Sequence, residues 1–234
     1  MKTHQSVYTL IRQYLLFTLT VLFLLTLARA GYNLWHFTQV SDVPTLVQSF
    51  WQGFKFDLAS VGVLLAVPVF VVPLLAMFRA TVPLARWFSL LWVALAFVLL
   101  VTLELVTPYF LESSAVRPDA SEFASAGGVV DMLADVWSRF MIPAIIGTVL
   151  VVLILIAFWG RLNTRHFLRK PVKMIPAIMM SVFGLAFCVM ATHASIDLTK
   201  PMIDPSAALV STESVVNEIT LNSTYKGLYA LLSQ

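Results

Sequence analysis

The chain has 234 residues, of which 59% are hydrophobic and only 12% are charged. Soluble domains average about 25% charged residues, so this composition excludes an ordinary soluble protein. The net charge of +3 does not indicate nucleic-acid binding, because the basic residues are concentrated in loops that would face anionic lipid headgroups. The single cysteine, Cys188, excludes an intramolecular disulfide and a thiolate metal cluster.

Five apolar segments are long enough to cross a bilayer, which requires about 20 mostly apolar residues in a helix. They are residues 14–34, 57–78, 87–110, 141–160 and 174–193. We therefore predict an all-α membrane protein, with a five-helix transmembrane domain over residues 1–193 and an extracytoplasmic juxtamembrane connector over residues 194–234. The first segment is too long for a typical signal peptide, which predicts a signal anchor.

Charged residues are distributed asymmetrically about these segments. Nine of the fifteen lysines and arginines, and no acidic residue, lie in three basic segments, residues 2–12, 79–86 and 161–173. All twelve acidic residues lie in the alternate segments or near the matching helix ends. Because cytoplasmic loops carry an excess of lysine and arginine, this pattern predicts a cytoplasmic N-terminus and an extracytoplasmic C-terminus.

Short interfacial helices are expected in the outer loops and the tail. Residues 41–44 (SDVP) form an N-cap signal, and the apolar spacing that follows predicts a short helix lying in the membrane interface. Similar spacing predicts a helix over residues 129–140. In the tail, Ser206 is placed to cap an amphipathic helix that runs from Ala207 to Ile219.

Three ionisable residues, Arg29, Asp57 and Glu104, lie within apolar segments, where a charge is costly. The predicted topology puts all three near the outer ends of the first three helices, and two interpretations remain open. In the first, they form an ion-paired packing cluster, with Arg29 paired to Glu104 or Asp57. In the second, Arg29, Lys55 and Arg117 face the phosphate of an anionic phospholipid such as phosphatidylglycerol. Asp57 and Glu104 would then hold these cations in place.

The sequence contains no recognisable catalytic or metal-binding motif. Its histidines are scattered over both sides of the membrane, and no two of them share a helix turn: His4, His36, His166 and His193. A nucleophile elbow, a zinc-protease motif and a phosphate-binding glycine loop are all absent. We therefore expect no catalytic residue, no metal and no cofactor site in this chain.

Four short stretches, taken together and in order, resemble the membrane region of one enzyme family. They are residues 53–58 (GFKFDL), residues 104–110 (ELVTPYF), residues 117–119 (RPD) and residues 216–225 (VNEITLNSTY). The last stretch is the best single match, and the resemblance spans nearly the whole chain. The family is the lipoteichoic-acid-synthase-like family, which includes phosphoglycerol transferases of the alkaline-phosphatase/sulfatase superfamily.

The resemblance implies five membrane helices followed by an extracytoplasmic catalytic domain with a threonine nucleophile and a divalent metal, often manganese. Such a domain moves a phosphoglycerol-type headgroup from a phospholipid to an acceptor. No residue of that domain is in this chain, so no catalytic role is carried over. The chain is expected to be either the isolated membrane portion of such an enzyme or a stand-alone relative.

The function that follows from the resemblance is that of a membrane anchor and lipid-presenting domain in the bacterial plasma membrane. Its expected partners are an anionic phospholipid and an extracytoplasmic catalytic domain. The alternative, from another class, is a non-enzymatic lipid-sensing or assembly scaffold that uses the same fold to bind partners. A small transporter is less favoured, because five crossings give no two-fold repeat and no paired broken helices are visible.

Overall fold

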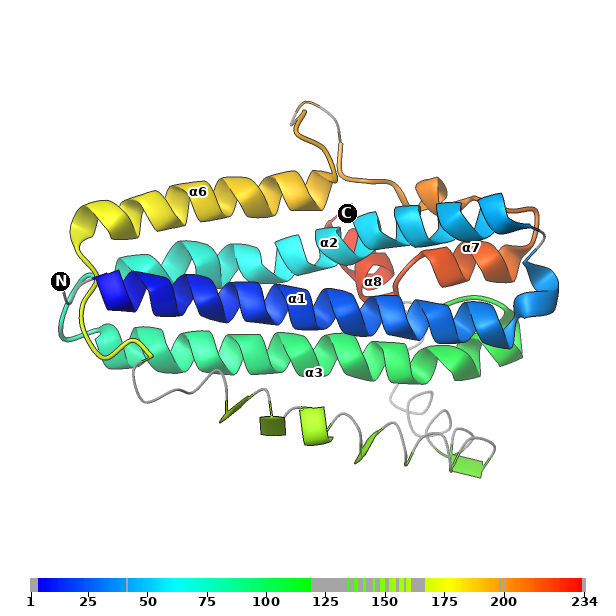
Figure 1. The fold of residues 1–234 in the computed structure, drawn as a ribbon, viewed down its shortest axis with the longest axis horizontal. Helices are drawn as coiled ribbons and strands as arrows, with labels where there is room; N and C mark the ends of the chain where they lie inside the picture. Colours follow the sequence, from blue (N-terminus) through cyan, green and yellow to red (C-terminus); the bar gives the residue numbers. More distant parts are fainter. Residues whose placement is uncertain are drawn as a thin grey trace.

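The computed structural model describes residues 4–40, 42–118, 167–197, 199 and 201–232, together with isolated positions between 134 and 160. The described elements are the helices α1 (His4–Trp35), α2 (Val43–Leu75), α3 (Val82–Ser114), α6 (Met174–His193), α7 (Ser214–Thr220) and α8 (Ser223–Leu232), with the 3₁₀ turns η1 (Phe37–Gln39) and η2 (Pro205–Ala208). The four long helices lie side by side, and α7 and α8 pack against one half of this bundle (Figure 1).

The four long helices α1, α2, α3 and α6 are each long and apolar enough to cross a membrane. The described part of the chain is therefore a multi-pass, all-helical membrane protein, as its composition predicts. The fifth predicted crossing, residues 141–160, and the predicted helix over residues 129–140 lie outside the continuously described residues. Which end of the bundle faces the cytoplasm stays a prediction.

The bundle has two chemically different ends. At one, Ser6 Oγ donates to the carbonyl of Lys170 at 3.1 Å, and Val172 N donates to the carbonyl of Ala76 at 2.8 Å. The start of α1, the turn between α2 and α3 and the segment before α6 therefore meet there, and we call it the basic end. The opposite end, where α1 and α3 end and α2 begins, is called the tail end because α7 packs there (Figure 1).

The separate interfacial helix predicted near Val43 is wrong. Asp42 does cap a helix, since its Oδ1 accepts a hydrogen bond from Thr45 N at 2.8 Å, and Pro44 lies in the first turn. That helix does not stop, however, because no residue before Pro68 interrupts it, and α2 continues to Leu75. Its 33 residues span about 50 Å, longer than a hydrocarbon core of about 30 Å, so α2 extends beyond the apolar layer.

Side chains of neighbouring helices hydrogen-bond to the backbone of α2 at and near its prolines. Pro68 has no N–H, which frees the carbonyl of Leu64, and Trp92 Nε1 on α3 donates to that oxygen at 2.7 Å. Ser181 on α6 donates to the carbonyl of Phe70 at 2.8 Å. α2 therefore runs through its prolines while its exposed carbonyls tie it to α3 and α6.

Two glycines allow α2 and α6 to approach closely. A Cβ atom at Gly62 would lie 2.7 Å from the carbonyl oxygen of Cys188, and one at Gly184 would lie 2.3 Å from Val69 Cγ1. Small residues have this role in membrane bundles, where association depends on close packing rather than on exclusion of water. The pair α2 and α6 forms the most extensive helix contact in the described structure.

The tail also differs from its prediction as a single amphipathic helix from Ala207 to Ile219. The short η2 turn is followed by a loop and then by α7. The loop is closed by Asn217, whose Oδ1 accepts from the backbone N–H groups of Val210 and Ser211, both at 2.8 Å. Ile219 and Tyr225 are completely buried, so the tail is an integral layer of the bundle rather than a strap on the membrane surface.

A candidate functional site of two buried ion pairs

The first ion pair joins α1 to α2 near the tail end. Arg29 donates from Nη1 to Asp57 Oδ2 at 2.7 Å and from Nη2 to Asp57 Oδ1 at 2.8 Å. This two-pronged geometry is the strongest that an arginine and a carboxylate can form. Their side chains are only 2% and 0% exposed, so water contributes almost nothing to their solvation.

The second ion pair joins α3 to the segment that follows it. Ala115 adopts a left-handed conformation with φ of 56°, which ends α3 and turns the chain back so that Arg117 points toward the bundle. Arg117 Nη1 lies 2.8 Å from Glu104 Oε1. Tyr32 supports the pair from α1: its ring lies under the Arg117 guanidinium, 5.7 Å from ring centroid to Cζ. Its hydroxyl donates to the backbone carbonyl of Glu104, which Pro108 leaves without an N–H donor.

The tail supplies a further hydrogen bond to each acid. Asn222 Nδ2 donates to Asp57 Oδ1 at 2.9 Å, and Ser223 N donates to Glu104 Oε1 at 3.2 Å. Asn222 also caps α8, because its Oδ1 accepts from Tyr225 N at 2.6 Å. A single turn of the tail therefore contacts both carboxylates and begins a helix at the same point.

The tail backbone links the two arginines. The carbonyl oxygen of Ile219 lies 3.3 Å from Arg29 Nε and 3.4 Å from Arg117 Nη2, so one acceptor serves both guanidinium groups. Glu218 accepts a hydrogen bond from the backbone N–H of Arg117 at 2.9 Å, and Lys226 donates to the Arg117 carbonyl at 2.9 Å. We call Arg29, Asp57, Glu104, Arg117, Asn222 and Ser223 the ionic cluster.

Four of the five residues predicted to form a site therefore do come together, and Lys55 does not join them. Its ammonium lies over the ring of Trp51, 5.5 Å from the centroid. Lys55 is two residues from Asp57, about 200° around the helix, so the two side chains leave α2 in different directions. Lys55 is half-buried and remains beside the cluster rather than within it.

One residue essential to the geometry was not singled out from the sequence. A Cβ atom at Gly53 would lie 2.2 Å from Arg29 Nε and 2.3 Å from Cζ, so the guanidinium rests directly on the α2 backbone. Gly53 precedes Asp57 by four residues, which places both on the same face of α2. A glycine one helical turn from a buried acid was the available signal.

The electrostatics of the ionic cluster are internally balanced. Two buried cations face two buried anions, and removing either partner of such a pair leaves an uncompensated charge in a low-dielectric environment. The arginine donors already engage carboxylates and tail carbonyls, so a lipid phosphate at Arg29 would compete with Asp57 for the same hydrogen atoms. A headgroup role for Arg29, Lys55, Asp57, Glu104 and Arg117 stays a prediction.

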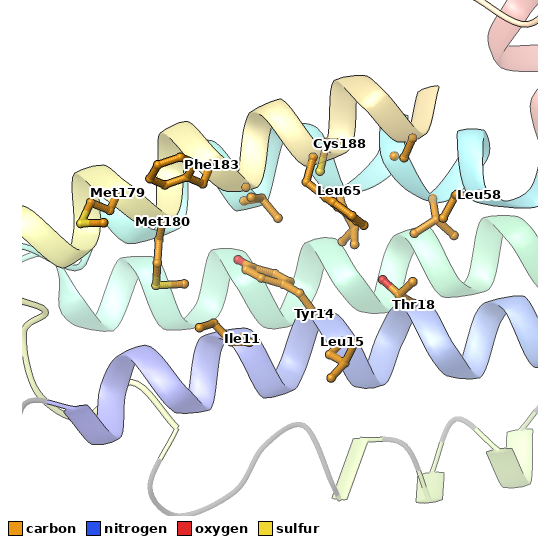
Figure 2. A pocket seen from close by; sticks show the side chains of 16 residues that line it. Ile11, Tyr14, Leu15, Thr18, Leu58, Leu65, Met179, Met180, Phe183 and Cys188 are labelled. Atoms are coloured by element: carbon orange, nitrogen blue, oxygen red, sulfur yellow. The ribbon is translucent and has the colours of Figure 1, made fainter. Parts of the chain in front are cut away.

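A second feature of the bundle is an apolar cavity between α1, α2 and α6, with a volume of about 500 Å³. Helices α1 and α6 lie on opposite sides of it. The side chains of Tyr14, from α1, and Leu65, from α2, lie in the space between these two helices (Figure 2). Atoms that border a space lacking contact partners lose dispersion energy, about 24 cal/mol per Å³ in protein cores. Apolar atoms that entered this space would regain such contacts.

Within the described ranges, no group of three or more His, Cys, Asp or Glu side chains is placed to hold a metal ion. No protein-family model matches the chain, and no solved structure matches it. Its function must therefore be argued from the ionic cluster, the cavity and the membrane-spanning bundle.

Proposed function

We propose that this chain is the membrane-embedded, lipid-presenting domain of a phosphoglycerol-type transferase in the bacterial plasma membrane. The observation that carries the proposal is the convergence of the stretches that resemble that family. The stretch 53–58, the neighbouring pieces 104–110 and Arg117, and the stretch 216–225 lie in three separate parts of the sequence, yet each contributes to the ionic cluster. Chance matches would not be expected to meet at one buried site, so the convergence supports a shared three-dimensional arrangement.

The cluster has a physical role that suits a transferase acting on lipid headgroups. An enzyme that attacks a headgroup must be held at a fixed height above the bilayer, because small displacements of reacting groups cost large factors in rate. Asn222 and Ser223 fix the tail to the carboxylates of α2 and α3, and this fixes whatever the tail positions outside the membrane. The nucleophile and the divalent metal are expected on the extracytoplasmic catalytic domain.

The headgroup contact is most accessible at Lys55. Arg29 and Arg117 are each 2% exposed and face acids, whereas Lys55 is half-buried and its ammonium lies over the ring of the 61%-exposed Trp51. Tryptophan and lysine are typical of the membrane–water interface, where a ring and an ammonium meet the headgroup layer. An anionic headgroup would therefore meet Lys55 before it met the buried arginines.

Lipid retention tests the proposal. The purified protein is reconstituted with equal amounts of phosphatidylglycerol and phosphatidylcholine carrying the same acyl chains, and native mass spectrometry counts the retained lipids. Wild type should retain more phosphatidylglycerol, and Lys55→Gln should reduce that preference. Lys55→Arg is the matched control, because it keeps the positive charge at this position and should keep the preference. Equal retention of the two lipids by wild type would contradict a headgroup-presenting role.

The scaffold alternative is favoured by one observation, the internal balance of the ionic cluster. Arg29 and Arg117 have protein partners on every side that the structure describes, so the cluster requires no ligand for its stability. An assembly scaffold would show no headgroup preference and would bind its partner through the tail. The retention experiment therefore separates a headgroup-presenting domain from an assembly scaffold.

A further inference from the structure

We infer that the cavity between α1, α2 and α6 binds one acyl chain of a bilayer lipid. The inference is independent of the transferase function, because it rests on the cavity and not on the ionic cluster. Three properties of the cavity support this inference: its length, its opening and its lining.

The cavity has the length of one bilayer leaflet. Along α2 its lining extends from Leu58 to Val69, which is about 16 Å at a rise of 1.5 Å per residue. Half of a hydrocarbon core of about 30 Å is about 15 Å. Leu58 directly follows Asp57, and the next charged residue of the chain is Arg79. The cavity therefore begins where the apolar part of α2 begins, near the tail end of the bundle, and extends toward the middle of that apolar part.

The cavity opens sideways, toward the surroundings of the bundle. Leu15 on α1 and Met179 and Phe183 on α6 line it and are 55%, 51% and 67% exposed, so they form its rim. Tyr14 and Leu65 also line it but are almost completely buried, so they form its floor (Figure 2). Since α1, α2 and α6 are each candidate membrane spans, an opening between them in the described part of the bundle would face the hydrocarbon of the lipids.

The lining is suited to a hydrocarbon chain and not to a headgroup or to water. The lining residues, all in the described parts of α1, α2 and α6, include no charged side chain. The Tyr14 hydroxyl is already engaged, lying 3.1 Å from the Pro68 carbonyl and 3.3 Å from Ser89 Oγ. A buried water would need two to four polar partners, which this lining does not supply.

The shape of the cavity favours a flexible chain over a rigid helix. The space of about 500 Å³ extends over about 16 Å between partly exposed rim residues and a buried floor, and a flexible chain can follow it down to Tyr14 and Leu65. A single acyl chain from the adjacent leaflet is the narrow, apolar occupant that the bilayer provides.

The test uses two adjacent positions on α1. Thr18 lines the cavity, whereas Leu19 does not and is 58% exposed. The protein is reconstituted separately with phosphatidylcholine and with phosphatidylglycerol of identical chains, transferred to detergent and analysed by native mass spectrometry. Wild type should retain one lipid with either headgroup. Thr18→Trp should reduce this retention by at least about fivefold, because the indole would occupy part of the space that the acyl chain needs, and Leu19→Trp should leave it unchanged.

Photocrosslinking distinguishes the loss of the lipid site from misfolding of the variant. A phosphatidylcholine with a photoreactive diazirine in one chain should crosslink to Tyr14 and Leu65, the buried floor of the cavity, in wild type, and Thr18→Trp should abolish these crosslinks. Crosslinks to Phe23, which is 67% exposed and outside the cavity lining, should persist in both proteins and show that the variant is inserted.

Several outcomes would overturn the inference. It fails if Thr18→Trp retains as much lipid as wild type, or if Leu19→Trp loses as much as Thr18→Trp. It also fails if wild type retains phosphatidylglycerol alone, a result that would leave the proposed transferase function intact. Conversely, one lipid retained in each separate reconstitution and lost only in Thr18→Trp would support the chain site, and the preference in the equal mixture would still test the proposed function by itself.

Discussion

The tail end and the middle of the bundle are stabilised by different chemistry. At the tail end, Arg29 and Arg117 are buried against acids, and the polar side chains of the tail complete their hydrogen bonds. In the middle, Gly62 and Gly184 bring α2 and α6 together, and the cavity beside them is lined by apolar residues. The structure of the tail end is specified by charge pairs and directional hydrogen bonds, whereas that of the middle is specified by the shapes of the packed side chains.

This difference has consequences for how each region responds to change. Charge pairs in a low-dielectric environment are intolerant of the loss of one partner, because the other is left without compensation. Apolar packing tolerates substitutions that conserve volume. The tail end should therefore behave as a rigid unit in which single polar substitutions are costly, whereas the middle should tolerate changes that keep its shape.

The largest expected effect is in cysteine labelling, which should be all-or-none because it reports which side of the membrane each end of the bundle faces. In a Cys188→Ser background, cysteine at Glu112, near the tail end, should react with a membrane-impermeant maleimide added from outside. Cysteine at Arg79, at the basic end, should react only after the membrane is permeabilised. Both residues are exposed in the structure, so accessibility differs only through the membrane. The reverse pattern would overturn the predicted orientation and the family argument that depends on it.

Loss of one charge from the ionic cluster should have the next largest effect. Asp57→Asn keeps the shape of the side chain but leaves Arg29 buried without a counter-charge, which should cost about 3–5 kcal/mol in the free energy of unfolding. Unfolding of the purified protein in a mixed-detergent titration measures this. The double variant Arg29→Met/Asp57→Leu should be markedly more stable than Asp57→Asn, because no lone charge remains.

The matched control for that measurement is Asp42→Asn at the start of the same helix. Asp42 is exposed and caps α2 through Thr45 N, and asparagine caps a helix about as well as aspartate. The control should therefore unfold almost as wild type does. Equal destabilisation by Asp57→Asn and Asp42→Asn would mean that the tail end is not the charge-specified region that we describe.

Gly53→Ala should have an intermediate effect, of about 1–3 kcal/mol, because its methyl group would occupy the position of the Arg29 guanidinium. Arg29 cannot easily move aside, since it is held by Asp57 and by the carbonyl of Ile219. Gly31→Ala is the opposite case, because nothing lies within 4 Å of its Cβ position, and it should stabilise α1 slightly. The same titration should therefore show opposite signs for the two substitutions.

Much of the architecture could be predicted from the sequence because apolar length and charge asymmetry are local signals. Helix α6 (Met174–His193) coincides with its predicted segment, because the composition changes at its two ends, after Lys173 and at Ala194. The start of α2 was missed by more than three turns. Nothing local stops that helix between Val43 and Asp57, and sequence alone could not show that polar residues there are buried by the tail.

The candidate site was half predictable for a related reason. Charges within apolar segments are conspicuous, so the sequence alone indicates Arg29, Asp57 and Glu104. The specific pairing of Glu104 with Arg117, rather than with Arg29, depends on the left-handed turn at Ala115. The contribution of Asn222 depends on a contact spanning 165 residues, and no pattern in a single sequence encodes so distant a contact.

The smallest predicted effect is a pH dependence of the tail outside the ionic cluster. The carboxylate of Asp204 accepts hydrogen bonds from Ser206 N–H at 2.7 Å and from the Tyr229 hydroxyl at 2.9 Å. These bonds favour its charged form and lower its pKa below the ordinary value of 3.8. The stabilisation is therefore fully present above about pH 4 and is lost as the pH falls through the lowered pKa.

Limited proteolysis of the tail between pH 6 and pH 3, with an acid-tolerant protease, measures this effect. Wild type should be uniformly protected down to about pH 4 and should become more susceptible below it. Asp204→Asn should be slightly more susceptible at pH 6 and should show a weaker increase on acidification, because its amide does not titrate. Glu213→Gln, which changes an exposed acid in the same tail, should follow wild type. Because Asp204 is fully exposed, the change should stay small and should leave the ionic cluster intact. If acidification instead released the whole tail at the same pH in wild type and in Asp204→Asn, the controlling group would lie elsewhere in the tail end.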